Sequence, residues 1–201
     1  MRLAFAFGLF ALLSACAAAI VQDNAPPEVI AAKAFRAPGP ASLTIMTMVN
    51  NRSGSGGHTA LMINGSQRVI FDPAGSFVND RVPERDDVLY GVTPAVLAGY
   101  KSAHARSTYH VVSQTITVTP EQAEVALRLA QQWGPVARSQ CTSATTRLLR
   151  QVPGFEDTRQ TLFPTNLMRQ FDQRPGVVTD KYYEDDDGSI LDGVAGVVIS
   201  E

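Results

Sequence analysis

The residues best suited to chemistry in this chain are one cysteine and three histidines. The sequence holds two cysteines, Cys16 and Cys141, and three histidines, His58, His104 and His110. If Cys16 carries lipid, as argued below, Cys141 has no partner for a disulfide. A thiol becomes a strong nucleophile when its thiolate is stabilised and a base can take its proton. The set therefore predicts acyl transfer by Cys141, provided that the fold brings a histidine to it.

Cys141 is predicted to lie in the first turn of a helix at about residues 140–151, with Ser139 as the N-cap and Pro153-Gly154 beyond the end. The first turn of a helix offers free N–H donors and the positive end of the dipole, and both favour a thiolate. The alternative is a buried structural cysteine, since free cysteines are among the residues most often buried. Position alone does not choose between these two roles.

His58 is the histidine that the pattern favours as the base. It follows a glycine-rich stretch at 52–57 and begins an apolar strand predicted at 58–63, which would hold the ring at the edge of a sheet. His110 lies inside a predicted strand, and His104 lies near the end of a predicted helix, where a solvated charge is expected. Pairing with Cys141 would turn His58 from a structural residue into a base.

Three segments together resemble a known group of enzymes. They are Gly57-His58-Thr59-Ala60-Leu61-Met62-Ile63, Arg68-Val69-Ile70-Phe71-Asp72-Pro73-Ala74-Gly75 and Gln140-Cys141-Thr142-Ser143-Ala144-Thr145-Thr146-Arg147-Leu148-Leu149. They resemble the circularly permuted NlpC-like cysteine hydrolases, a papain-like group that includes lecithin retinol acyltransferase and its relatives. In that group a histidine on a strand comes first, a polar residue follows on the next strand, and the nucleophilic cysteine opens a later helix. This chain has the same order over residues 42–155.

The resemblance implies a role for each of three residues. Cys141 would be the nucleophile, His58 the base that takes its proton and later protonates the leaving group, and Asp72 the group that orients His58. The backbone N–H of Cys141 would contribute to an oxyanion hole. Relatives often carry histidine, asparagine or glutamine at the third position, so Asp72 departs from the pattern. Its alternative role is to cap the turn before Pro73.

The hairpin turn decides where Asp72 points. A two-residue turn at Asn64-Gly65 pairs His58 with Phe71 and leaves Asp72 on the other face of the sheet. A three-residue turn over Asn64-Gly65-Ser66, with a bulge, pairs His58 with Asp72 on one face. An orienting role for Asp72 therefore predicts the bulged turn.

The remaining pattern predicts an α+β domain. The clearest helix follows Thr119, with Pro120 at its first position and Gln122 completing a capping box. The expected strands are 42–49, 58–63, 67–71, 107–118 and a final strand or two that include 193–200. The expected helices are 94–104 (capped by Thr93), 120–133, 140–151 and 165–171. With the resemblance, this implies a permuted papain-like fold in which an antiparallel sheet packs on the helix that carries Cys141.

The N-terminus predicts export and lipidation. Arg2 precedes an apolar run that is too short to span a bilayer, which takes about 20 residues as a helix. Leu13-Ser14-Ala15-Cys16 resembles the lipobox of bacterial lipoproteins, which implies a signal peptide at 1–15 and a lipid-bearing Cys16. The alternative is an ordinary cleaved signal with a chance cysteine. Ala17 is not the aspartate that often retains lipoproteins in the inner membrane, so the periplasmic face of the outer membrane is expected.

The composition limits the partners. Residues 16–40, rich in alanine and proline, are predicted to tether the lipid to a single domain at 41–201. The formal net charge is -2 and no basic block occurs, so nucleic-acid binding is not expected, and membrane contact is expected through the lipid. The cysteine and histidines lack zinc-site spacing, and the acidic run at 184–187 lacks the outer ligands of a calcium loop. Neither a metal nor a cofactor is predicted.

Three functions are compatible with these observations. The first is an envelope-anchored cysteine hydrolase that cleaves amide bonds, with cell-wall peptides as the expected substrate. The second is a lipid-directed acyltransferase or esterase. The third is a non-catalytic envelope lipoprotein that binds a peptide or protein partner, with Cys141 merely buried. The sequence leaves the oligomeric state open.

Overall fold

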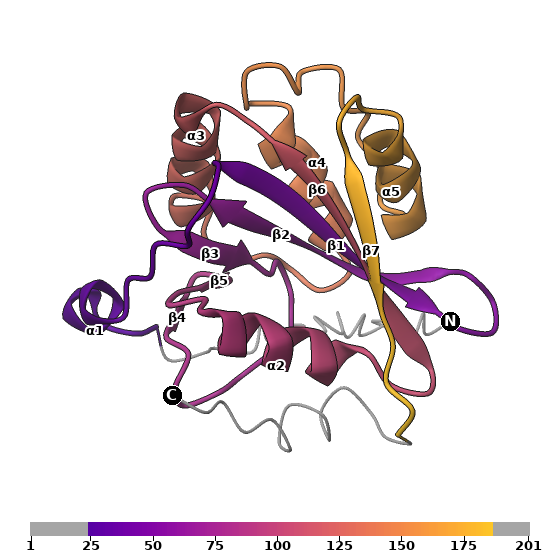
Figure 1. Cartoon of the computed structure of the whole chain (residues 1–201), viewed down its shortest axis with the longest axis horizontal. Helices are drawn as coiled ribbons and strands as arrows, with labels where there is room; N and C mark the ends of the chain where they lie inside the picture. Colours follow the sequence, from indigo (N-terminus) through magenta and orange to yellow (C-terminus); the bar gives the residue numbers. More distant parts are fainter. Residues whose placement is uncertain (1–23, 187–201) are drawn as a thin grey trace, which may run out of the picture.

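The computed structural model describes residues 24–186 as an α+β domain built on one antiparallel sheet (Figure 1). Three sequence predictions, the signal peptide at 1–15, lipidation of Cys16 and the strand at 193–200, lie outside the described residues. Among residues 24–186, no helix combines the length and the apolar character needed to cross a membrane.

The sheet has seven strands in the order β4-β5-β3-β2-β1-β6-β7, and each neighbouring pair is antiparallel. The strands are β1 (Ser42–Asn50), β2 (Gly56–Asn64), β3 (Arg68–Phe71), β4 (Glu84–Arg85), β5 (Val88–Leu89), β6 (Tyr109–Thr117) and β7 (Val178–Tyr182). The central strand β1 is buried on both faces, because Leu43 and Ile45 join one hydrophobic cluster and Met46 and Met48 join another. The short strands β4 and β5 were not anticipated from the sequence pattern, whereas β7 follows α5, where a final strand or two were expected.

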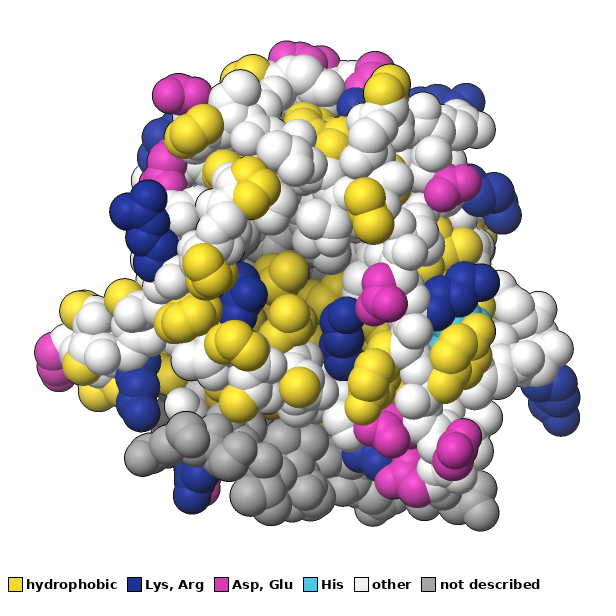
Figure 2. All heavy atoms as spheres, in the orientation of Figure 1, with side chains coloured by type: hydrophobic (Ala, Val, Ile, Leu, Met, Phe, Trp, Pro, Cys, Tyr) yellow, Lys and Arg dark blue, Asp and Glu magenta, His cyan; other side chains and the backbone are white. Residues whose placement is uncertain are grey.

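Helices cover both faces of this sheet. They are α1 (Pro27–Ala32), α2 (Pro94–His104), α3 (Pro120–Gln131), α4 (Cys141–Leu149) and α5 (Pro164–Asp172). Helices α3, α4 and α5 lie on one side, and α2 lies on the other side (Figure 1). On the face shown in Figure 2, hydrophobic side chains line a hollow near the middle of the molecule, with charged groups at its rim.

Two helices begin where the sequence predicts. Thr93 caps α2 by accepting a hydrogen bond from the Val96 N–H at 3.2 Å. Thr119 and Gln122 form both bonds of the predicted capping box at the start of α3. These local signals succeed because the partners of each cap lie within one turn of the same helix.

Helix α4 begins at Cys141, so the prediction that the cysteine occupies the first turn is confirmed. The predicted cap is wrong. Gln140 occupies the N-cap position without a side-chain cap bond, and Ser139 has a left-handed φ of 66°. Ser139 therefore turns the chain into the helix instead of capping it.

The β2–β3 hairpin has neither of the two predicted turns. Asn64 pairs with Arg68 and Leu61 pairs with Phe71, so the connecting loop is Gly65-Ser66-Gln67, one position later than the predicted three-residue turn. Continued by one residue, this register places Asp72 opposite Ala60. Because side chains alternate, Asp72 still shares a face with His58. The predicted register is wrong, but the face that it assigned to Asp72 is right.

The segment predicted as a tether is fixed to the domain from residue 24 onward. It contains α1, and the Ala25 N–H donates to the Glu84 carbonyl at 2.8 Å. Further along, the Phe35 carbonyl accepts from the Arg68 N–H at 2.7 Å. The described part of the segment therefore pairs with the β3 and β4 side of the sheet, which a free linker would not do.

Candidate active site

The candidate site lies where β2 extends past the end of β3. Strand β3 stops at Phe71, opposite Leu61, whereas β2 begins earlier in the chain, at Gly56. The start of α4 lies beside the part of β2 that pairs with β1 but has no β3 residue opposite it. The Thr59 N–H donates to the Cys141 sulfur, and the hydroxyls of Thr59 and Thr142 lie 3.2 Å apart. The early end of β3 thus makes room for the thiol.

The structure brings together all three residues that the sequence singled out. Cys141 is unpaired, 7% exposed, and hydrogen-bonded to the His58 ring. The other side of that ring is held by Asp72, whose Oδ1 lies 2.7 Å from His58 Nε2. Because Nε2 contacts the carboxylate, Nδ1 is the nitrogen left to face the sulfur. The result is a hydrogen-bonded chain of thiol, imidazole and carboxylate.

This chain changes the protonation of both partners. Burial alone would raise the pKa of the Cys141 thiol, but its hydrogen bond to His58 and the positive charge of that ring lower the pKa from 9.0 to about 7. Burial would likewise lower the pKa of His58, but the charge and hydrogen bond of Asp72, with help from Cys141, raise it from 6.5 to about 10. Between pH 7 and 10 the pair is therefore a thiolate and an imidazolium.

Asp72 points toward His58 and does not cap its turn. Its Oδ1 also accepts a hydrogen bond from the Tyr100 hydroxyl at 2.7 Å. The turn itself is closed by the backbone, where the Gly75 N–H donates to the Asp72 carbonyl at 2.8 Å. Burial would raise the pKa of this carboxyl, but the positive charge of His58 and its hydrogen bond lower it. The carboxylate stays charged, and it has a second donor that the sequence did not reveal.

His104 was predicted to be a solvated charge at a helix end, and this prediction is wrong. The side chain is 2% exposed, and its Nδ1 lies 2.8 Å from the Tyr100 carbonyl. Burial lowers the pKa of His104 to about 4, so the ring is neutral at physiological pH and donates from Nδ1 to that carbonyl. It stacks 6.1 Å from the His58 ring. His104 therefore packs as a neutral, buried ring against the ring of the candidate base.

His110 lies away from this chain of contacts. Its Nδ1 is 2.7 Å from the Asn51 side-chain oxygen, and its ring stacks on Tyr183 at 4.5 Å. Neither contact involves Cys141. His58 is therefore the histidine that the fold pairs with the thiol.

Asp87 connects the loops of the site to one another, a role that no sequence pattern indicated. Its carboxylate Oδ2 accepts the Ala74 N–H at 3.1 Å and the Val136 N–H at 2.7 Å. Its carbonyl accepts the Asp72 N–H at 2.8 Å. The β4–β5 turn thereby holds both the loop that follows Asp72 and the loop that leads to Cys141.

Gly75, like Tyr100 and Asp87, is a feature of the site that sequence reasoning missed. A Cβ at this position would lie 1.9 Å from Asp72 Oδ2 and 2.8 Å from the Asp72 carbonyl oxygen. The turn was recognisable as Asp-Pro-Ala-Gly, but the reason for the glycine is the carboxylate folded back above it. Any larger residue must displace Asp72.

Gly75→Ala should therefore raise the pKa of the Cys141 thiol, because a displaced Asp72 no longer supports the positive charge of His58. The measurement is the rate of alkylation by iodoacetamide as a function of pH. Gly176→Ala is the matched control, since its φ of +81° makes it strained but its Cβ meets nothing within 4 Å. The control should lower the melting temperature without moving the thiol pKa. Equal thiol pKa values in both variants would contradict the role given to Gly75.

Within residues 24–186, no three His, Cys, Asp or Glu side chains are grouped so that they could hold a metal ion. The acid and base groups of the site are those of the cysteine, the histidine and the aspartate themselves.

Comparison with known proteins adds no identification, because no protein-family model, curated protein or solved structure gives a significant match to this chain. The chemistry has to be inferred from the site. A thiolate backed by an imidazolium can attack a carbonyl carbon, and the same imidazolium can protonate the group that leaves.

Proposed function

We propose that this protein is a cysteine hydrolase that cleaves amide bonds through an acyl-enzyme. The observation that supports it best is the chain from the Cys141 thiol through His58 to the buried Asp72 carboxylate. A structural cysteine has no need of a thiol pKa of about 7. Strongly shifted pKa values with named charge partners are typical of catalytic sites.

The proposed reaction follows from the protonation states. The Cys141 thiolate attacks the amide carbonyl, and a carbon–sulfur bond forms as the carbonyl oxygen becomes negative. The N–H of Cys141 lies in the first turn of α4, where no acceptor within the helix is available, and is suited to bind that oxygen. The imidazolium of His58 protonates the leaving amine as the carbon–nitrogen bond breaks. Water, deprotonated by the now neutral His58, then attacks the thioester carbonyl; the carbon–sulfur bond breaks, the acid is released, and the thiolate–imidazolium pair is restored.

The order of the site along the chain supports a permuted papain-like arrangement. His58 and Asp72 lie on and just after strands that precede the Cys141 helix, and that helix packs against β2. We extend the proposal to an envelope enzyme anchored through Cys16 that acts on cell-wall peptides. The lipobox-like segment supports the location, and the resemblance to NlpC-like hydrolases supports the substrate.

One observation favours a second candidate, a lipid-directed acyltransferase or esterase. Leu162 and Phe163 are 54% and 65% exposed, immediately before α5. The next residue, Pro164, lies against Gly56, where an added Cβ would approach it to 2.5 Å. Gly56 is two residues from His58, so this apolar pair borders the site. The pair Leu162 and Phe163 is suited to contact an acyl chain, and also an apolar part of a peptide.

Cys141→Ala should abolish hydrolysis because it removes the nucleophile. The purified mature protein would be incubated with defined cell-wall peptide fragments and, separately, with phospholipid vesicles, and new amines or free fatty acids would be measured. We expect amine release from peptides by the native protein and none by Cys141→Ala. Mass spectrometry of the intact protein should detect an acyl adduct on Cys141 after brief reaction. Release of fatty acid alone would favour the second candidate, and a thiol that titrates near pH 9 with no product would refute both.

A further inference from the structure

A cavity of about 430 Å³ lies between the loop after α4 and the exposed side of α5. Two of its lining residues are arginines, Arg159 and Arg169, and the others are amides and a hydroxyl, among them Gln160 and Thr161. No acidic side chain lines it. Among residues 24–186, neither arginine forms an ion pair with a carboxylate, although Arg169 binds the Asn166 side-chain oxygen. The cavity therefore presents positive charge that nothing described neutralises.

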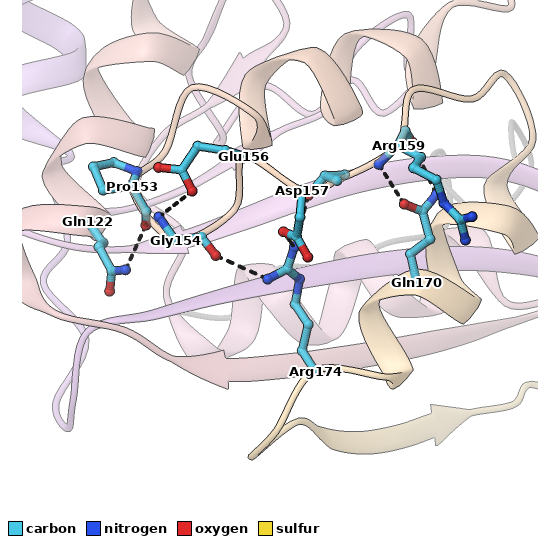
Figure 3. Close-up of polar contacts among 9 residues, drawn as sticks. Gln122, Pro153, Gly154, Glu156, Asp157, Arg159, Gln170 and Arg174 are labelled. Carbon is cyan, nitrogen blue, oxygen red and sulfur yellow. Dashed lines mark hydrogen bonds and ion pairs between the residues drawn. The ribbon is translucent and has the colours of Figure 1, made fainter.

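The walls of this cavity are held in place by hydrogen bonds between the loop and α5 (Figure 3). The Gln170 side chain accepts the Arg159 N–H at 2.7 Å and donates to the Arg159 carbonyl at 3.1 Å. Further along, Arg174 donates to the Gly154 carbonyl at 3.1 Å and also pairs with Asp157. The backbone that carries Arg159 is thus fixed before any ligand arrives.

The loop and helix that form the cavity also contact the elements that carry the catalytic residues. The loop returns along α4 from its end to its beginning, where the Gln160 side chain reaches the Ser143 hydroxyl at 3.4 Å. Ser143 belongs to the first turn of α4, as Cys141 does, although residues two apart on a helix point to different sides. On its other side, α5 begins at Pro164, against Gly56 and near His58. The two walls of the cavity thus contact α4, which begins at Cys141, and β2, which carries His58.

We propose that this cavity binds a carboxylate of an acidic peptide substrate, an inference that rests on the proposed hydrolase function. Guanidinium groups pair with carboxylates through two parallel hydrogen bonds. The surrounding glutamines and Asn166 supply both donors and acceptors, as peptide groups require, whereas a phosphate only accepts. An extended peptide advances about 3.5 Å per residue, and the proposal places the bound carboxylate two or three residues from the bond that is cut, within reach of a loop that contacts the first turn of α4.

The test uses peptide chloromethyl ketones, which alkylate a cysteine when sulfur bonds to carbon and chloride leaves. Reagents with glutamate at the second or third residue from the reactive carbon would be compared with the same reagents carrying glutamine. At one of these positions, the native protein should react about tenfold faster with glutamate, the factor expected for one charge-assisted contact. Arg159→Gln and Arg169→Gln should each reduce this preference to about threefold or less.

Two controls separate this inference from the proposed function. Arg150→Gln removes an exposed arginine at the other end of α4 and should keep the preference for glutamate. The rate with iodoacetamide, which has no carboxylate, should be the same in the native protein and in Arg159→Gln. A native thiol that is reactive at pH 7 but does not distinguish glutamate from glutamine at either position overturns the inference and leaves the hydrolase intact. Arginine-dependent binding to phosphatidylglycerol vesicles without that preference would assign the cavity to a lipid headgroup and overturn it as well.

Discussion

His58→Ala should move the pH at which Cys141 is half deprotonated from about 7 to 9 or above. Without the imidazolium, burial is the strongest remaining influence on the thiol, and it raises the pKa. At pH 7 the thiolate fraction would fall from about one half to about one hundredth. A more basic thiolate is intrinsically more nucleophilic, which recovers part of the loss, so the alkylation rate at pH 7 should fall about tenfold. The midpoint of the pH profile, measured with iodoacetamide, is the cleaner readout.

The control for this prediction is His110→Ala, which removes a ring that contacts Asn51 and Tyr183 and should leave the midpoint near pH 7. Unfolding would also give an ordinary thiol, so the fold has to be checked. The single tryptophan, Trp133, packs edge-on against Phe71 and gives a near-ultraviolet dichroism signal for that purpose. A folded His58→Ala protein whose thiol still titrates near pH 7 would remove the basis of the proposed mechanism.

Asp72→Asn should lower the kcat of hydrolysis by about 10³-fold or more, as expected when the carboxylate behind a catalytic histidine is lost. In the native protein we expect activity to rise with pH through about 7, as the thiol ionises, and to fall through about 10, as His58 loses its proton. The carboxylate is what raises the pKa of His58 against its burial. With asparagine, the pKa of His58 should fall below 6.5, its ordinary value. At the pH where the Cys141 thiolate forms, His58 would then have lost the proton that it donates to the leaving amine.

The pH profile distinguishes this mechanism from simple loss of stability. A damaged fold lowers the rate at every pH, whereas loss of the carboxylate lowers the pKa of His58 from about 10 to below 6.5, so the alkaline limb no longer lies near pH 10 and the thiol sets it instead. Proton NMR of the His58 ring measures the same change directly. Asp180→Asn, at the exposed partner of Lys101, is the matched control and should leave both limbs in place. An alkaline limb that stays near pH 10 in Asp72→Asn would show that another group carries the proton.

The sequence was informative wherever a residue acts through its near neighbours. The caps at Thr93 and Thr119 and the placement of Cys141 at the start of a helix were all predicted, because each depends on residues within one turn. The pairing of Cys141 with His58 depends on residues far apart in the chain and came only from the order of the motifs. The face of Asp72 was predicted correctly through a turn that does not exist, since alternation needs only the right parity.

The parts that could not be predicted depend on contacts across the fold. His104 has the sequence position of a solvated helix end, yet Tyr100, Phe77 and His58 bury it. Tyr100 lies inside the helix predicted at 94–104, and nothing local shows that its hydroxyl reaches Asp72. Gly75 and Asp87 belong to turns whose composition is ordinary. Their importance comes from the neighbouring atoms of other elements, which a linear pattern does not contain.

The contacts of Asp87 have a consequence for how this site can be remodelled. The Asp87 side chain binds both the loop behind the imidazole and the loop before the sulfur. The two-residue bend that carries Asp87 therefore sets the distance between these two loops. Both residues of that bend, Asp86 and Asp87, have positive φ angles, 50° and 61°. An insertion there would alter the reacting geometry without touching a reacting group. Variation in substrate preference is therefore more easily accommodated in the chain around α5 than in this small hairpin.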